Sequence, residues 1–188
     1  MEITEYLKYV EDSLKLIDKN DVDKFVKMLM DAYENNKMIF IIGNGGSSAI
    51  ASHFAQDLAK GVIPDINEEK RFKALSLTDN APFITAVAND DGYENIFSSQ
   101  LKTYSSEGDL LVIVSGSGNS PNIVSAAKYA KTKKMKLAGI TGFDGGELKK
   151  LSNLSIHIGL NDYCTVESIH TIILHYVILH LKEELAKN

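Results

Sequence analysis

The sequence predicts an α/β protein in which a five-stranded parallel sheet is flanked by helices and preceded by two N-terminal helices. Apolar runs of strand length alternate with amphipathic stretches, and the connections between runs are long enough for parallel crossovers. Twice, at 38–58 and 110–130, an apolar run leads into a turn rich in Gly, Ser and Asn and then into an amphipathic stretch. With 188 residues, 44% of them hydrophobic, and no Pro/Gly/Ser-rich linker, the chain is expected to form a single domain over 1–188. Its N-terminal helices lie within 1–36, and the sheet, the flanking helices and a C-terminal helix lie within 37–188.

Helical spacing of apolar residues predicts the two leading helices at 3–17 and 21–35. The first apolar run, at 38–42, is expected to be a buried strand, and the Gly-rich turn after it leads into a helix at 47–60. The remaining predicted elements, in chain order, are an exposed loop at 64–70, a strand at 72–77, short helices at 82–87 and 94–104 flanking a polar turn at 89–92, a strand at 110–114, a helix at 121–132, strands at 137–141 and 154–158 separated by a turn and a short helix, and a long helix at 165–186. Apolar residues lie nearly all round this last helix, so we expect it to be buried on several sides, as a subunit interface would bury it.

Composition limits the classes of partner. The formal net charge is −5 and the pI is about 5.5, whereas a general nucleic-acid binder usually carries a basic face, so no nucleic-acid partner is expected. The single cysteine, Cys164, excludes an internal disulfide. Neither a signal peptide nor an apolar run of about 18 residues is evident. A cytoplasmic protein without a membrane partner is therefore expected.

The two Gly/Ser-rich turns are the first candidate site. Each follows a predicted parallel strand, at the edge of the sheet where α/β proteins bind ligands. Unpaired backbone N–H groups, the positive end of a helix dipole and serine hydroxyls together suit a phosphate, so two such turns suggest a phosphorylated small molecule. The hydroxyls belong to Ser47, Ser48, Ser115, Ser117 and Ser120.

A plainer interpretation of each turn is a tight strand-to-helix connection in which glycine supplies a positive φ. Nucleotide binding is disfavoured, because Ser48 stands where the third glycine of G-x-G-x-x-G would be, and the turn lacks the lysine of a P-loop. No nucleotide cofactor is therefore expected.

Two pairs of polar side chains on helices form the second candidate site. His53 and Asp57 are four residues apart and share one helix face, with Ser47 about 9 Å back along the axis. On the last helix, Glu167 and His175 are eight residues apart and lie nearly on one stripe. If the two helices converge, the two histidines and two carboxylates would make a divalent metal site, because zinc accepts imidazole and carboxylate together. A solvated polar pair and a hydrogen-bonded core histidine remain open as alternatives.

Three further polar motifs have plainer explanations. Asn89-Asp90 lies in a predicted turn, where Asn and Asp are common for conformational reasons alone. Asp144-Gly145-Gly146 is interpreted as an ordinary turn before a helix, and His157, inside a strand, as structural. A functional role for Asn89 and Asp90 therefore depends on the resemblance described next.

Several motifs follow one another in a specific order: GNGGS with HFA after it, then VAND, SGSGNSPN, TGFDGG, and VESIH with a further histidine five residues on. Over nearly the whole chain this series resembles the sugar isomerase (SIS) domain and, within it, the phosphoheptose isomerases. The resemblance implies a flavodoxin- or Rossmann-like three-layer sandwich around a five-stranded parallel sheet. It also implies a homotetramer with active sites between subunits.

The resemblance also assigns roles to individual residues. The substrate would be held by Asn44, Gly45, Gly46, Ser47, Asn89, Asp90, Ser115, Gly116, Ser117, Ser120 and Glu167, with the Ser-rich turn taking the phosphate. Asp57 and His175 would be the catalytic acid-base residues, and zinc would be held by His53, Asp57, Glu167 and His175. Two positions depart from the family pattern, because Asp57 stands where the family has Glu and Glu167 where it has Gln. These changes either preserve the site, adapt it to another sugar phosphate, or abolish activity.

The activity implied by the resemblance is the interconversion of sedoheptulose 7-phosphate and D-glycero-D-manno-heptose 7-phosphate, in nucleotide-heptose and surface polysaccharide synthesis. Moving a proton between adjacent carbons through an enediol requires a base near the carbon acid and a group that stabilises the oxyanion. Asp57 and His175 suit the proton transfers, and zinc suits polarisation of the carbonyl. Two alternatives stay open: an isomerase of another sugar phosphate, and a non-catalytic phosphosugar-binding SIS protein that binds a replication initiator.

Overall fold

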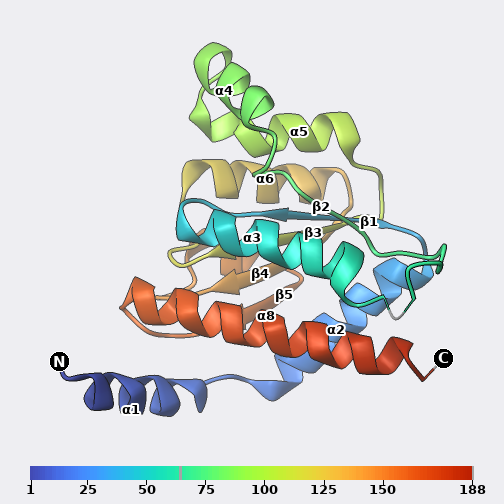
Figure 1. Ribbon diagram of the computed structural model, residues 1–188. Coiled ribbons are helices and arrows are strands. Elements are labelled where there is room, and N and C mark those ends of the chain that lie inside the picture. Colours follow the sequence, from blue (N-terminus) through green and yellow to red (C-terminus); the bar gives the residue numbers. More distant parts are fainter. Residues whose placement is uncertain (64, 188) are drawn as a thin grey trace.

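The structure, a computed structural model that describes residues 1–63 and 65–187, centres on a sheet of five parallel strands in the order β2-β1-β3-β4-β5 (Figure 1). The strands are β1 (Met38–Ile42), β2 (Lys73–Ser76), β3 (Leu110–Ser115), β4 (Lys136–Thr141) and β5 (Leu154–His157). The predicted fold class, the strand count and the parallel direction are confirmed. The predicted loop at 64–70 begins at Pro64, outside the described residues, and 65–70 forms a turn and irregular chain.

Both faces of the sheet are buried, which is why the strands are apolar throughout. Successive side chains of a strand point to opposite faces, so Ile39 and Ile41 pack in one cluster while Phe40 and Ile42 pack in the other. The first face is covered by α2 (Lys19–Glu34), α3 (Gly46–Gln56) and α8 (Tyr163–Leu185), and the second by α5 (Ile96–Tyr104), α6 (Pro121–Thr132) and α7 (Gly146–Leu151), with α4 (Ala81–Asp90) stacked on α5 (Figure 1).

Capping residues set where the N-terminal helices begin and end. Asp18 accepts a hydrogen bond from the Asn20 N–H at 2.9 Å, so α2 begins at Lys19 rather than at residue 21. The residues before this cap leave the helix, and α1 (Ile3–Leu14) therefore ends three residues earlier than predicted. In Figure 1, α1 runs alongside α8 and outside the layers that cover the sheet.

The helix predicted at 47–60 is not uniform. The α-helix α3 ends at Gln56, and the chain continues as a π-helical turn, η1 (Asp57–Gly61), closed by a bond from the Val62 N–H to the Asp57 carbonyl at 3.1 Å. Single π turns inside helices are frequent at functional sites. Asp57 is the first residue of this turn, so it lies at the point where the chain changes from α-helical to π-helical geometry.

The polar turn predicted at 89–92 is wrong in its first half, because α4 continues through Asn89 and Asp90. Asn80 starts the helix by accepting a bond from the Phe83 N–H at 3.2 Å. Asn89 and Asp90 are exposed, so their polarity is compatible with a final helical turn. The helix ends where Gly92 adopts a φ of 95°, before the short helix η2 (Tyr93–Asn95) and α5.

The last helix, α8, lies against α2 and α3 on the first face of the sheet. With 23 residues and a mean hydropathy of 1.3 over its most apolar window, it is long and apolar enough to cross a membrane by length and composition alone. This was not expected from the sequence, because polar side chains interrupt the run. Half of that window is buried inside the fold, as in the core helix of a soluble protein, so the helix is weak evidence of a membrane span.

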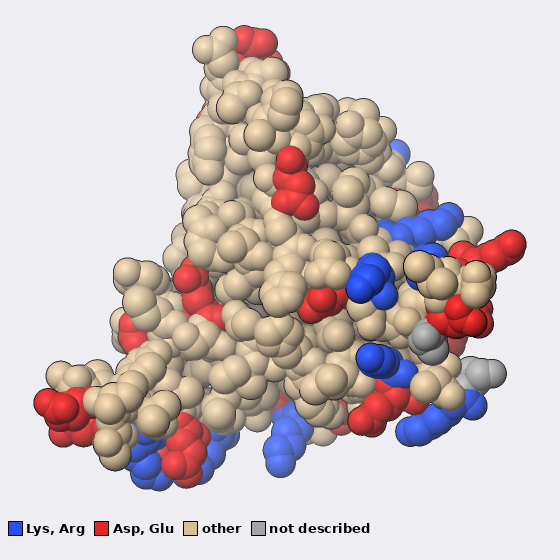
Figure 2. Space-filling model, viewed as in Figure 1, with Lys and Arg blue, Asp and Glu red and all other residues tan. Residues whose placement is uncertain are grey.

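Several apolar side chains of α8 remain exposed, although the sequence predicted burial on several sides. Ile172, Tyr176 and Leu179 are 44%, 49% and 62% exposed. Figure 2 shows that wide areas of the face that carries α3 and α8 have no Lys, Arg, Asp or Glu. Within one chain, α8 is therefore covered on the side that meets the sheet and open on the other.

Candidate active site

The two Gly/Ser-rich turns meet at one edge of the sheet. The first turn follows β1 and starts α3, and the second follows β3 and starts α6. β1 and β3 are neighbours in the sheet, while β2 lies on the far side of β1. In open α/β sheets, ligands bind in the crevice where the strand order reverses in this way. The fold thus brings together the two turns that the sequence singled out.

Glu167, on α8, lies against the start of α3. Ser47 Oγ donates a hydrogen bond to Glu167 Oε1 at 3.2 Å, and a β-carbon added at Gly46 would overlap the same carboxylate. A negative group at a helix N-terminus is stabilised by the helix dipole. Because the start of α3 already faces a carboxylate, a phosphate is better accommodated at the second turn.

The second turn, 115–120, is held by internal hydrogen bonds to two of its three serine hydroxyls. Ser115 Oγ accepts a bond from the Gly118 N–H at 3.1 Å, and Ser117 Oγ accepts one from the Asn119 N–H at 3.3 Å. Ser120 is the N-cap of α6, and its side chain caps none of the helix N–H groups that the structure describes. Ser117 is exposed and Ser120 is half-buried, so the hydroxyl groups of both are accessible near the N-terminus of α6, the end of a helix that suits an anion.

The Asp144-Gly145-Gly146 motif supports this second turn, a role that the sequence interpretation missed. Asn119 Oδ1 accepts a bond from the Glu147 N–H at 2.9 Å, and the Leu148 N–H donates to the Gly118 carbonyl at 3.0 Å. A β-carbon at Gly118 would overlap the Gly145 carbonyl. The same close approach explains Gly146, whose added β-carbon would overlap the Ser117 carbonyl, whereas Gly145 has a φ of 84° as the N-cap of α7, in line with the predicted turn before a helix.

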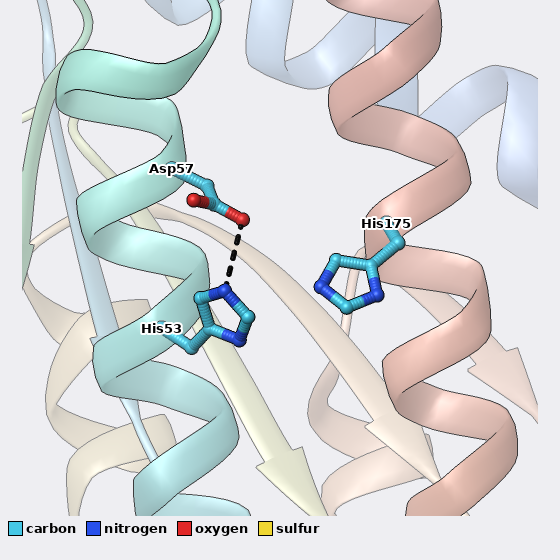
Figure 3. A group of neighbouring side chains, drawn as sticks. All are labelled: His53, Asp57 and His175. Atoms are coloured by element: carbon cyan, nitrogen blue, oxygen red, sulfur yellow. Dashed lines mark ion pairs between the residues drawn. The ribbon is translucent and has the colours of Figure 1, made fainter.

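Two imidazoles and a carboxylate converge between α3 and α8 (Figure 3). His53 Nε2 and Asp57 Oδ2 are 3.3 Å apart, and the ring centroids of His53 and His175 are 5.0 Å apart at an interplanar angle of 77°. One ligand atom from each of the three residues lies within 4.8 Å of the others. The helices thus converge at the point that the metal hypothesis requires.

The three side chains line a pocket of about 180 Å³. It is bounded by Ala49, Ile50, His53, Phe54, Asp57, Thr171, Leu174 and His175. The His53 side chain is 54% exposed and that of Asp57 is 20% exposed. The pocket therefore opens to solvent on the histidine side, while the carboxylate lies deeper.

The donor set fits a zinc ion. Zinc in catalytic sites is held by three protein ligands, commonly imidazoles and a carboxylate, with a fourth position open to water or substrate. His53, Asp57 and His175 offer this combination. Glu167, the fourth expected ligand, lies instead on Ser47, eight residues and about 12 Å along α8 from His175.

The remaining candidate residues, Asn89 and Asp90, are carried by α4, which packs against α5 and η2. Asn89 Nδ2 donates to Asp90 Oδ1 at 2.7 Å, and both side chains are exposed at the end of α4. Tyr93, three residues further on, donates its hydroxyl proton to Asn44 Oδ1 at 3.4 Å. This contact joins the segment after α4 to the first turn.

Two other histidines lie in structural positions. His157 Nδ1 is 3.1 Å from the Thr141 hydroxyl, and burial lowers its pKa below the ordinary value. His170 is fully buried, and burial lowers its pKa to about 4, an effect that the nearby Thr141 carbonyl partly opposes. Neither ring nitrogen of His170 has a hydrogen-bond partner of good geometry among the described residues.

Comparison with known proteins identifies the family of the chain. Residues 5–142 match the family model of the SIS domain. The phosphoheptose isomerase of Aliarcobacter butzleri is 32% identical over 186 residues, which cover 98% of this chain and 97% of that protein. That of Buchnera aphidicola is 36% identical over 181 residues, covering 92% and 90%. The solved structure of a phosphoheptose isomerase from Francisella tularensis superposes with a TM-score of 0.85 at 26% identity, covering 96% of each chain. The chain therefore belongs to the SIS domain family, in the branch of the phosphoheptose isomerases.

Proposed function

We propose that the protein is a phosphoheptose isomerase that interconverts sedoheptulose 7-phosphate and D-glycero-D-manno-heptose 7-phosphate. The observation that carries the proposal is that His53, Asp57 and His175 meet in one pocket. This pocket lies beside α3, the helix that starts at the crevice between β1 and β3. Similarity to phosphoheptose isomerases along nearly the whole chain supports the substrate class. The product would enter nucleotide-heptose and surface polysaccharide synthesis.

The substrate would span from the second turn to the pocket. Its phosphate would lie at the start of α6, against Ser115, Gly116, Ser117 and Ser120. Its sugar hydroxyls would be held by Asn44, Gly45, Gly46, Ser47, Asn89, Asp90 and Glu167. About 9 Å of helix separates Ser47 from His53, so an extended sugar phosphate brings its carbonyl end towards the pocket.

In the pocket, Asp57 and His175 would transfer the proton. One of them removes a proton from C1 of the ketose, the C1–C2 double bond forms, and the C2 oxygen takes up a proton to give the enediol. A proton then returns to C2 while the C1 hydroxyl loses its own, which leaves the aldehyde. Acid-base groups placed in this way contribute about 10²- to 10⁴-fold to the rate.

A zinc ion is the cofactor that we propose. His53, Asp57 and His175 would hold it, with Glu167 as the fourth ligand only if its bond to Ser47 is given up. When bound, zinc would polarise the substrate carbonyl as a Lewis acid. Because a carboxylate that holds a metal is a weaker base, the two roles of Asp57 would alternate.

We also propose that residues 1–188 form one cytoplasmic domain that assembles as a homotetramer with active sites at subunit interfaces. The exposed apolar side chains of α8 support this assembly, as do Ile3 and Leu7 on α1, which are 67% and 60% exposed. A groove of about 710 Å³ lies between α8 and the chain from α1 to α2, lined by Leu14, Ile17, Val22, Ile172, Ile173 and Tyr176 among others.

Exchange of solvent deuterium tests the activity. Purified protein is incubated in deuterium oxide with sedoheptulose 7-phosphate or, as a control, fructose 6-phosphate, and deuterium in the sugar is measured by mass spectrometry. We expect exchange into the heptulose alone. Exchange into fructose 6-phosphate alone would assign another sugar phosphate. If neither sugar exchanges but both raise the melting temperature, the protein binds phosphosugars without isomerising them.

A further inference from the structure

Asn122, the second residue of α6, is buried against Asn44 of the first turn. Asn44 Nδ2 donates to Asn122 Oδ1 at 2.9 Å, and Asn122 Nδ2 donates to Asn44 Oδ1 at 2.8 Å. Asn122 is 1% exposed. This reciprocal pair of amides is a direct hydrogen-bonded link between the first turn and the helix that starts at the second.

The backbone fixes which way both amides point. The Ile123 N–H donates to Asn122 Oδ1 at 2.9 Å. A backbone N–H can only donate, so the oxygen of Asn122 must face it, and the Asn122 nitrogen must face Asn44. Asn44 then has to present its oxygen to that nitrogen. The orientation of Asn44 therefore follows from the backbone at the start of α6.

This arrangement determines what Asn44 can offer to a ligand. Its Oδ1 accepts from Asn122 and from the Tyr93 hydroxyl, the latter at 3.4 Å, which occupies both lone pairs. One of its two N–H groups is donated to Asn122. What remains is a single N–H on a half-buried side chain, so Asn44 is a donor for a ligand oxygen and not an acceptor.

We propose that Asn122 is a positioning residue, which orients Asn44 as a hydrogen-bond donor to a sugar oxygen and holds the two turns in register without touching the substrate. This inference rests on the proposed function, because it takes Asn44 as a substrate contact. The two turns hold two ends of one ligand, so their relative placement decides how well it fits.

Two substitutions test the pair. Asn122→Asp keeps the size and the acceptor for the Ile123 N–H but places a carboxylate oxygen against Asn44 Oδ1, and Asn122→Ala removes both bonds. For each, we expect KM for sedoheptulose 7-phosphate to rise about tenfold, the effect of losing one or two hydrogen bonds, with kcat within about threefold of the wild type. A merely structural residue would lower the melting temperature without this split.

Asn153→Asp is the matched control. Asn153 Oδ1 accepts from the Leu137 N–H at 2.8 Å, so the substitution alters the same kind of bond at the opposite edge of the sheet. We expect it to leave KM unchanged. Tyr93→Phe removes only the second donor to Asn44 Oδ1, and because Tyr93 is 56% exposed it tests the same amide even if the Asn122 variants fail to fold. It should raise KM about threefold.

A ligand-free crystal structure of Asn122→Asp separates this inference from the proposed function. Asn44 turned away from its present position, together with the KM split, supports positioning. An unmoved Asn44, or unchanged KM in Asn122→Asp and Tyr93→Phe while Asn44→Ala raises it, overturns the inference. If the wild type neither isomerises nor binds sedoheptulose 7-phosphate, the proposed function fails, and the position of Asn44 in the variant crystal alone decides whether Asn122 orients it.

Discussion

The position of His175 is what separates a candidate active site from a solvated polar pair on one helix. His53 and Asp57 are 3.3 Å apart and one helical turn from each other, which fits both interpretations. The ring of His175 comes from α8 and lies beside His53 (Figure 3). Two imidazoles and a carboxylate then share one pocket, and both kinds of side chain can act as general acids or bases.

Replacement of His175 by alanine is expected to reduce deuterium exchange into sedoheptulose 7-phosphate at least about 100-fold, because it removes an acid-base group. The ligand should still raise the melting temperature, since the phosphate would lie at the start of α6. His180→Ala is the control: His180 is on the same helix and exposed, but outside the cluster. Exchange at the wild-type rate in His175→Ala would show that the assignment is wrong.

His170 is expected to make the fold sensitive to acid. Its pKa is lowered from 6.5 to about 4 by burial, so between these values the unfolded chain binds a proton that the native chain does not. The contribution of His170 to the free energy of unfolding is therefore fully present above pH 6.5. It falls as the pH drops, by about 3 kcal/mol between pH 6.5 and about pH 4. His157, whose pKa burial also lowers, contributes in the same direction.

Urea unfolding of His170→Leu checks this. Between about pH 7 and pH 5, the wild type should lose about 2 kcal/mol more unfolding free energy than the variant. The variant should be no less stable than the wild type at neutral pH, because an apolar side chain leaves no buried polar atom unpaired. His180→Gln, at an exposed position, serves as the control. An equal loss in His170→Leu and the wild type would exclude His170 as the cause.

At the scale of elements, local pattern predicted the strands and helices but not all of their ends. The strands are short apolar runs bounded by turn residues, a signal that needs no knowledge of the rest of the chain. The ends of α4 and α3 depend on more distant features. Asn89 and Asp90 have the composition of a turn, yet α4 includes both and ends at Asp90, because their side chains face solvent and suit a final helical turn. The π turn at Asp57 has no sequence signal that we recognise.

The second turn is expected to depend on Gly118. Its φ of 64° lies in the left-handed region, and a β-carbon would overlap the Gly145 carbonyl, so Gly118→Ala must distort the turn that we propose holds the phosphate. We expect at least a tenfold weaker affinity for sedoheptulose 7-phosphate by calorimetry, on the order of the effect of one or two lost hydrogen bonds.

Gly108→Ala is the control for backbone strain alone. Gly108 has a φ of 84° at the opposite edge of the sheet, and its added β-carbon would meet the flexible end of Lys37. Gly108→Ala should lose about 1–2 kcal/mol of unfolding free energy, since a left-handed conformation costs this much for a residue with a β-carbon, and Gly118→Ala should lose at least as much because its β-carbon also overlaps the Gly145 carbonyl. Weaker sugar phosphate binding in Gly108→Ala as well would mean that general strain, not the second turn, is responsible.

At the scale of the whole molecule, the sequence could nominate site residues but not place them. The two turns adjoin because β1 and β3 are neighbours, a fact of strand order that no local pattern contains. The same holds for α8, whose path across α3 brings His175 to Asp57 but leaves Glu167 at the start of α3. The family resemblance supplied roles for these residues. Only the fold shows that Glu167 lies at the start of α3 and His175 near its end.

The proposed homotetramer predicts that the exposed apolar surface of α8 is buried in the assembled protein. Light scattering should give the wild type a mass of four times the 20.7 kDa chain. Leu179, 62% exposed, becomes charged in Leu179→Glu, and burying an unpaired charge at an interface is costly enough to dissociate it. Tyr104→Glu, at an exposed position on the other face of the sheet, should keep the wild-type mass.

Isomerase activity should fall with dissociation in Leu179→Glu, because the active sites are proposed to lie between subunits. A wild-type mass of one chain would contradict the assembly, and a fully active, monomeric Leu179→Glu would instead place the complete site within a single chain.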